Sequence, residues 1–497
     1  MTYGPPPSPF TQSQRAAVER RQRRTRLWVS VIAVLVVVAC AGGWLMWAGL
    51  PGGGKGDAAG GHSARKQAPD EVRETVEKRP KDRSGHLAVS LVDELEPGKT
   101  LNMPGTWATD TVLVKGMNST LEGITIGTDD EAWHYNLSGA ICGTTQHVTA
   151  DGRTAVLFRS GNGKSLCNQL AFFDLDNGKK LWQVTIPTSK SSFGEDLPNV
   201  TLTRGVVATA WSGGSAAYDM SGGEQLWERK RTSECREDGF AGGRALVIEL
   251  HCMPDPSKPL ISEIRVQRRD PRTGEAMWTY KVPKGIELAY LVSAEPPVIA
   301  VSAGEAGLTE MISLDGKGKY RATIRLEDGR YDLDCAVDDM QSSALDHCAP
   351  VVIGRSQAFV TGGEQTEGIN HTSNWIVSFD LATGKTVKKF DSGADQMIYP
   401  IRMSGDRLLA FKEGTDNFAP SSVVSLNPAT GTETPYYYFN VPSEAHFMDP
   451  KTDGIVFEGG RIFFASTQVQ GEGQKGKPAR IWGAVGIESV AARHVPK

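Results

Sequence analysis

The chain has 497 residues, with 54 Lys and Arg against 58 Asp and Glu, and a formal charge of −4 at pH 7. Six arginines fall within residues 1–26, so the rest of the chain is more acidic than this total. An acidic surface argues against nucleic acid as a ligand, because that ligand favours a basic face.

Residues 1–26 are hydrophilic, with several prolines at the start and six arginines against one acidic residue, Glu19. We expect a disordered basic tail here. Because positively charged flanks stay on the cytoplasmic side of a membrane, the tail also predicts that the N-terminus is cytoplasmic.

Residues 27–50 contain no charged side chain. At 1.5 Å per residue such a helix would span about 36 Å, enough to cross a hydrocarbon core of about 30 Å. Trp28, Trp44 and Trp47 lie near its ends, where indole rings favour the membrane interface. The run predicts one transmembrane helix in the plasma membrane, with the C-terminal part extracytoplasmic.

A cleaved lipoprotein signal is the alternative for this segment. Residues 37–40 (VVAC) loosely fit a lipobox, and Cys40 would then carry the lipid. The apolar run continues to Leu50, however, whereas a cleavable apolar region ends at its cleavage site. Both interpretations tether the protein to a membrane and face it outward.

Residues 51–86 are rich in glycine and charged residues and poor in apolar ones, which predicts a flexible linker. Residues 87–497 hold nearly all of the aromatic and β-branched side chains and form the predicted extracytoplasmic domain. A segment of roughly 410 residues fits two or three ordinary domains, or a single repeat architecture.

Six cysteines fall within this predicted domain, and an even number in an exported domain favours disulfides. They could pair in 15 ways in principle. Sequential pairing is favoured because each pair of neighbouring cysteines falls within one unit of the sequence repeat described below. A metal site is disfavoured because no C-x-x-C occurs. The candidates in order are Cys142, Cys167, Cys235, Cys252, Cys335 and Cys348.

The predicted domain repeats a short motif in which Gly follows Asp by four residues and Trp follows Gly by four. The Asp side chain can start a turn, and the Gly supplies the positive φ that the turn needs. Weaker copies end at Trp133, begin at Leu314, or lie near Val485. The clearest copies contain Asp174, Gly178 and Trp182; Asp219, Gly223 and Trp227; Asp270, Gly274 and Trp278; Asp380 and Gly384; and Gly431, with Asn427 in the Asp position.

Successive copies are about 45–50 residues apart, and strand-like apolar runs lie between them. Four short strands per repeat of this length are typical of a β-propeller blade. The sequence therefore predicts an all-β fold of seven or eight blades, preceded by the transmembrane helix. The long interval from Asp315 to Asp380, which contains Cys335 and Cys348, leaves the number of blades open.

The D-x-x-x-G-x-x-x-W motif of Asp174–Trp182, Asp219–Trp227 and Asp270–Trp278 resembles the PQQ-like, or quinoprotein, β-propeller repeat. The resemblance covers roughly residues 100–490. With its predicted transmembrane helix, the chain looks like the membrane-anchored bacterial members of the family. It implies that the tryptophans pack between neighbouring blades. The family includes PQQ-dependent dehydrogenases and non-enzymatic scaffold proteins of outer-membrane assembly.

Catalytic groups are not recognisable in the sequence. The quinoprotein dehydrogenases use a catalytic Asp, calcium ligands and often a disulfide between adjacent cysteines, but no Cys-Cys pair occurs here. We therefore expect no catalytic residues, no PQQ and no metal. The acidic segment from Asp332 to His347 could form a calcium-type site, although a solvated loop closed by a disulfide is the favoured interpretation.

These observations favour a membrane-anchored binding or scaffold module for a protein or cell-envelope partner, and not an enzyme. Propeller rims carry many loops on a rigid ring, which suits such contacts. A quinoprotein-like oxidoreductase is one alternative. The other is the sensor ectodomain of a signalling complex, which would need another membrane protein because the cytoplasmic tail is too short to fold.

Overall fold

The computed structural model describes residues 67–492, except for residues 164, 189, 192–193, 196–197, 233, 254–262, 303–306, 327–329, 336–347, 368–370, 416–418, 443, 446–452 and 473–476. The predicted tail and transmembrane segment lie outside the described residues. The part of the chain that is described has no helix with the length and apolarity needed to cross a bilayer.

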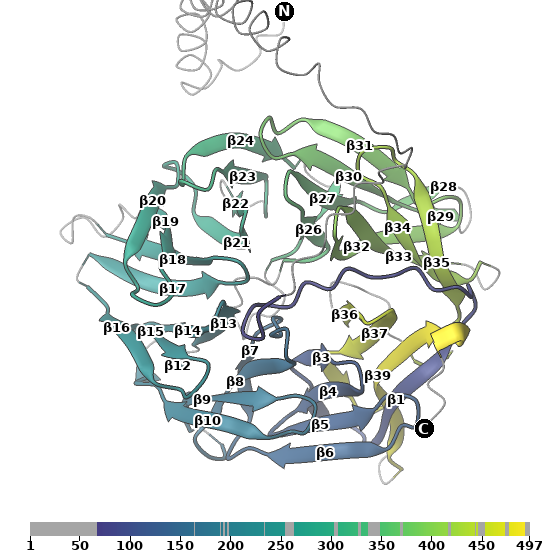
Figure 1. Ribbon diagram of the computed structural model, residues 1–497, viewed down its shortest axis with the longest axis horizontal. Coiled ribbons are helices and arrows are strands. Elements are labelled where there is room, and N and C mark those ends of the chain that lie inside the picture. Colours follow the sequence, from purple (N-terminus) through teal and green to yellow (C-terminus); the bar gives the residue numbers. More distant parts are fainter. Residues whose placement is uncertain are drawn as a thin grey trace, which may run out of the picture. The chain divides into compact units, whose positions relative to one another are not determined.

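Short antiparallel sheets form a ring of eight blades, as Figure 1 shows. The all-β propeller prediction is confirmed, and the number of blades is eight. The first four blades are β3 (Thr106–Ala108), β4 (Val112–Met117), β5 (Thr120–Thr125) and β6 (Glu131–Asn136); β7 (Ile141–Thr144), β8 (Arg153–Arg159), β9 (Cys167–Asp174) and β10 (Lys180–Thr185); β13 (Asn199–Thr203), β14 (Val206–Trp211), β15 (Gly214–Asp219) and β16 (Gln225–Lys230); and β17 (Cys235–Ala241), β18 (Leu246–Cys252), β19 (Glu263–Arg269) and β20 (Ala276–Lys281).

Three further blades follow in chain order. They are β21 (Leu288–Ala294), β22 (Pro297–Ser302), β23 (Glu310–Leu314) and β24 (Tyr320–Arg325); β25 (Tyr331–Asp332), β26 (Val351–Ile353), β27 (Gln357–Gly362), β30 (Trp375–Asp380) and β31 (Thr386–Asp391); and β32 (Gln396–Ser404), β33 (Arg407–Gly414), β34 (Ser421–Leu426) and β35 (Glu433–Phe439). In the sixth blade both β25 and β26 pair with β27, so the inner strand is interrupted by residues 333–350. The long interval before Asp380 therefore adds no further blade to the described part of the ring.

Both ends of the described chain build the eighth blade, which consists of β36 (Asp453–Glu458), β37 (Arg461–Ser466), β39 (Ala479–Ser489) and, as its outer strand, β1 (Gly85–Leu95). Residues 485–489 continue β39, so the weak motif copy expected near Val485 is wrong. No turn is needed there, because the fourth strand comes from the other end of the chain.

Small pairs of strands lie outside the blades: β2 (Thr100–Asn102) with β38 (Gln468–Gln470), β11 (Lys190–Ser191) with β12 (Gly194–Glu195), and β28 (Gln365–Glu367) with β29 (His371–Ser373). A short 3-10 helix, η1 (Val490–Ala492), follows β39.

The hydrophobic core is a ring of eight clusters, each lying between two neighbouring blades. The cluster between the eighth and first blades joins Val89 of β1 and Phe463 of β37 to Leu113 of β4. Because every blade is covered on both faces by its neighbours, the middle strands are buried along most of their length. All six residues of β14, for example, are buried.

The repeated turns link the blades through a Trp–Gly contact. The indole N–H of Trp182 donates to the carbonyl of Met220 in the next blade, at 3.0 Å, and its ring lies against Gly223. Trp133, Trp227 and Trp278 pack in the same way on the turn glycines of the blades that follow them. In the later blades, Gly384 faces backbone of Thr323 and Gly431 faces Lys388 instead.

Candidate functional site

The two faces of the ring differ. In every meandering blade, the turns from first to second strand and from third to fourth strand lie on one face, which we call the strap face. The connections from second to third strand and from one blade to the next lie on the opposite, long-loop face. The Asp–Gly turns belong to the strap face because they join third and fourth strands. There the carboxylate of Asp219 accepts the backbone N–H of Ser221 at 2.8 Å, and Gly223 has a φ of 74°.

Residues 67–84, which we call the strap, cross the strap face before β1 begins (Figure 1). The strap contacts first-to-second-strand turns of the second, third, fourth, seventh and eighth blades. Arg73 donates its backbone N–H to Val148 of the second blade at 2.8 Å, and Gly205 of the third blade donates to Asp70 at 3.0 Å. The flexible linker predicted for residues 51–86 is therefore wrong for residues 67–86. A segment with few apolar residues is ordered here, mainly by hydrogen bonds and ion pairs.

Three strap glutamates, spaced three residues apart, pair with arginines from three blades. Glu71 lies 3.5 Å from Arg204 of the third blade, and Glu74 is hydrogen-bonded to Arg244 of the fourth. The third, Glu77, is hydrogen-bonded to Arg402 of the seventh blade.

Glu77 is the most enclosed of these anchors. Its carboxylate also accepts the backbone N–H groups of Gly459, at 3.1 Å, and Gly460, at 2.8 Å. Burial raises the pKa of the Glu77 carboxyl, an effect that Arg402 opposes and Glu458 reinforces. The carboxylate joins the strap to the seventh and eighth blades at one point.

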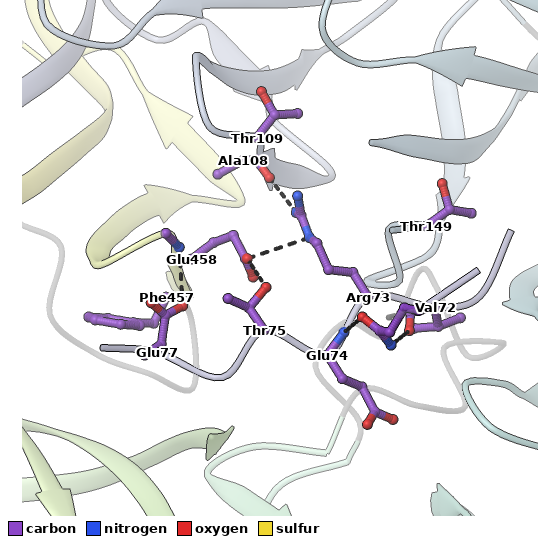
Figure 2. A network of polar contacts seen from close by, with 12 residues as sticks. Val72, Arg73, Glu74, Thr75, Glu77, Ala108, Thr109, Thr149, Phe457 and Glu458 are labelled. Atoms are coloured by element: carbon purple, nitrogen blue, oxygen red, sulfur yellow. Dashed lines mark hydrogen bonds and ion pairs between the residues drawn. The ribbon is translucent and has the colours of Figure 1, made fainter. Parts of the chain in front are cut away.

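A polar network at the centre of the strap face surrounds Glu458 at the end of β36, as Figure 2 shows. Arg73 of the strap donates to the carbonyl of Ala108 in the first blade and lies 3.6 Å from the Glu458 carboxylate. The hydroxyl of Thr75 donates to the same carboxylate. Arg402 donates to the Thr75 carbonyl at 2.8 Å.

Beneath this network, a cavity of about 400 Å³ occupies the channel of the ring. First strands of the first, second, sixth, seventh and eighth blades line it, and Val72 and Arg73 line it from the strap. Its volume is in the range of small-molecule pockets. Its two arginines, Arg73 and Arg402, are both hydrogen-bonded to carbonyls and carboxylates of the protein.

The three predicted disulfide pairs are confirmed: Cys142–Cys167, Cys235–Cys252 and Cys335–Cys348. The first two lie at the long-loop ends of their strands. Cys142 is next to the start of β7 and Cys167 starts β9, whereas Cys235 starts β17 and Cys252 ends β18. The third bridge joins two residues that lie between β25 and β26 of the sixth blade, where Asp334 pairs with Ala349.

The sequence-predicted residues therefore separate into two sets. The turn residues lie on the strap face between blades, four of the cysteines lie on the long-loop face, and Cys348 lines the cavity in the channel. Much of the acidic segment from Asp332 to His347, including Asp338, Asp339 and Asp346, lies outside the described residues. Among the residues that are described, no group of three His, Cys, Asp or Glu side chains could hold a metal ion.

Sequence reasoning missed the strap and its partners. The only local signal was the spacing of Glu71, Glu74 and Glu77 in a charged segment. Their arginine partners lie 133 or more residues away in a chain that gives no periodic indication of the pairing.

The family model described as outer membrane protein assembly factor BamB matches residues 83–234 and 167–403. Together these matches span more than half of the chain. The chain belongs to this family of PQQ-like β-propeller proteins.

A comparison with curated protein sequences gave no significant match. Among solved structures, BamB from Moraxella catarrhalis is similar at 13% identity and a TM-score of 0.42, covering 79% of this chain and 99% of that one. The quinohemoprotein alcohol dehydrogenase ADHIIG from Pseudomonas putida HK5 is similar at 10% identity and a TM-score of 0.47, covering 86% of this chain and 80% of that one. The quinohemoprotein alcohol dehydrogenase from Comamonas testosteroni is similar at 12% identity and a TM-score of 0.45, covering 86% of this chain and 82% of that one. At these sequence identities the similarity concerns the fold alone.

Proposed function

We propose that the protein is a membrane-anchored extracytoplasmic scaffold that binds a protein or cell-envelope partner through its long-loop face. The observation that carries this proposal is the placement of two disulfides, Cys142–Cys167 and Cys235–Cys252, at the long-loop ends of the strands. Cross-links concentrated on one face hold its connections in fixed positions. A preorganised surface loses less conformational entropy when it binds, which favours affinity.

The same bridges support the extracytoplasmic location, because structural disulfides persist in oxidising compartments. The membrane anchor itself is proposed from the uncharged run at residues 27–50 and its arginine-rich flank. Family membership supports protein contacts in general terms, since the matching family is described as an outer membrane assembly factor.

We also propose that the scaffold works without a quinone cofactor. PQQ carries several carboxylates, so a channel that binds it needs available cationic donors. With the strap in place, the two arginines in the described lining of the cavity are already hydrogen-bonded: Arg73 to Ala108, and Arg402 to Phe457 and the strap. None of the disulfides joins adjacent cysteines. These residues do not fit the cofactor of the dehydrogenases.

Site-specific photocrosslinking in membranes tests the scaffold proposal. Benzoylphenylalanine would replace Leu288, at the long-loop end of β21, or Asn162, in the loop between β8 and β9; both residues are exposed. Matched controls would replace Asp176 or Lys317, exposed residues of third-to-fourth-strand turns on the strap face. We expect discrete adducts from the first pair that the control pair does not give. The same adducts from both faces, or no adduct from the long-loop positions, would contradict the proposal.

Reconstitution tests the cofactor proposal separately. The purified full chain would be mixed with PQQ and Ca²⁺ and assayed for a bound quinone absorbance band and for dye reduction with alcohol substrates. We expect neither signal. A stoichiometric quinone band together with dye reduction would contradict this proposal and support an oxidoreductase instead.

A further inference from the structure

The strap is bound to the ring as an extended peptide ligand would be. Its contacts are backbone hydrogen bonds and ion pairs, and its only regular pairings are isolated bridges at Val72 and Ser84. It buries little apolar surface: Val72 packs, partly buried, against the core between the second and third blades, and the side chain of Val76 is 60% exposed. Segments with few buried apolar contacts open at a low free-energy cost. The strap can therefore separate from the face while the blades stay folded.

The surface beneath the strap is suited to carboxylates. Arg204 of the third blade, Arg244 of the fourth and Arg402 of the seventh all face strap glutamates. Arg204 and Arg244 remain 64% and 43% exposed even when the strap is in place, so solvent reaches both pairs. Guanidinium groups fit carboxylates because their planar donors match the two oxygens.

Backbone groups of the ring fix the orientation of the segment bound on this surface. The carbonyl of Val148 accepts from Arg73, and the N–H of Ala150 donates to Glu71, both at 2.8 Å. At the other end, the N–H groups of Gly459 and Gly460 hold the Glu77 carboxylate. Main-chain pairing with fixed side-chain anchors is how domains recognise extended peptides.

From these contacts we infer that the strap face is a binding site for extended acidic peptides, occupied in cis by residues 67–79. The trans ligand is a segment of a partner protein with carboxylates three residues apart, which replaces the strap when the strap opens. Exchange also opens the cavity in the channel, because Val72 and Arg73 line it from the strap. This inference does not depend on the partner proposed for the long-loop face.

Peptide binding tests the inference on the full chain. The probe is a fluorescein-labelled peptide of residues 67–79. Its host is the variant Glu71→Gln/Glu74→Gln/Glu77→Gln, which weakens the strap and leaves the arginines in place. The matched control is Glu94→Gln/Glu224→Gln/Glu275→Gln, which makes the same charge change at exposed glutamates outside the strap.

By fluorescence anisotropy, we expect the strap variant to bind the probe about tenfold more tightly than the native chain or the control, because three ion pairs of the competing strap are lost. Binding should weaken with salt. It should be lost with a probe carrying Gln at the three Glu positions, and when Arg204→Ala and Arg244→Ala are added to the strap variant. No binding by the strap variant, or equal binding of the Gln probe, would overturn the inference.

Hydrogen exchange of the native chain provides a measurement that needs no variant. The Arg73 amide, bonded to Val148, reports strap opening, and the Leu157 amide in β8 reports unfolding of a blade. We expect Arg73 to exchange at least about a hundredfold faster than Leu157. Equal protection would show that the strap opens only when the blades unfold, and it would exclude exchange with a partner.

Discussion

Replacing Gly223 by alanine is expected to destabilise the protein strongly, whereas the same change at its neighbour Gly222 is not. Gly223 has a φ of 74°, and the left-handed region costs a side chain about 1–2 kcal/mol. A Cβ atom there would also lie 2.7–3.0 Å from three atoms of the Trp182 ring. Overpacking of this kind costs about 1–3 kcal/mol, which gives about 2–5 kcal/mol in total.

The indole of Trp182 cannot retreat from the added methyl group. It stacks on Phe172 with ring centres 5.5 Å apart, contacts Tyr218 on the other side, and is held by its hydrogen bond to Met220. A Cβ on Gly222, in contrast, has no heavy atom within 4 Å. Gly222→Ala should change the free energy of unfolding by less than about 1 kcal/mol, in either direction.

Urea unfolding followed by circular dichroism measures both variants against the native chain. A third variant, Gly223→Ala with Trp182→Phe, separates the two costs, because the smaller ring relieves the contact but not the backbone strain. We expect a favourable coupling of about 1–3 kcal/mol between the two substitutions. The reasoning is refuted if Gly222→Ala and Gly223→Ala lower the midpoint equally, or if the coupling is absent.

Three further predictions concern charged groups of the third and fourth blades. Burial raises the pKa of Glu249 well above its ordinary value, so its stabilising protonated form is lost as pH rises; Glu249→Gln should raise the melting temperature at pH 8 more than at pH 5. Arg269 forms a buried pair with Glu237, so Arg269→Met should cost about 3–5 kcal/mol in urea unfolding, and adding Glu237→Leu should recover most of it. Hydrogen bonds from Ser221 lower the pKa of Asp219 to about 2, so its contribution is present above its ordinary pKa and is lost as pH falls toward 2; Asp219→Asn should flatten the acid limb of the stability profile. An unchanged pH profile in either carboxyl variant, or a neutral Arg269→Met, would contradict the corresponding assignment.

The repeat could be predicted from the sequence because its chemistry is local. In each copy, the Asp that starts the turn, the Gly that takes a positive φ and the Trp that resumes the strand lie within nine residues. Asp219, Gly223 and Trp227 illustrate this, and the same spacing gave the blade architecture. The disulfide pairing could be predicted as well, because paired cysteines belong to the same repeat. Cys235 and Cys252, for example, lie in adjacent strands of one blade, directly opposite each other.

The eighth blade and the strap were not predictable in this way. β1 completes a sheet whose other strands begin at Asp453, and no local pattern indicates that pairing. The strap is polar, so its composition resembles that of a linker. Its order depends on Arg204, Arg244 and Arg402, which come together only after several blades have folded into a ring.

The sequence by itself thus determined the kind of blade, the phase of the repeat and the disulfide pairs, since these depend on residues close along the chain. Only the tertiary structure decided how the ring closes, which face the strap covers and which charges meet at the centre of that face. Ion pairs such as Glu77 with Arg402 join residues 325 positions apart. Charged side chains have no periodicity that would reveal such a partner before the ring has formed.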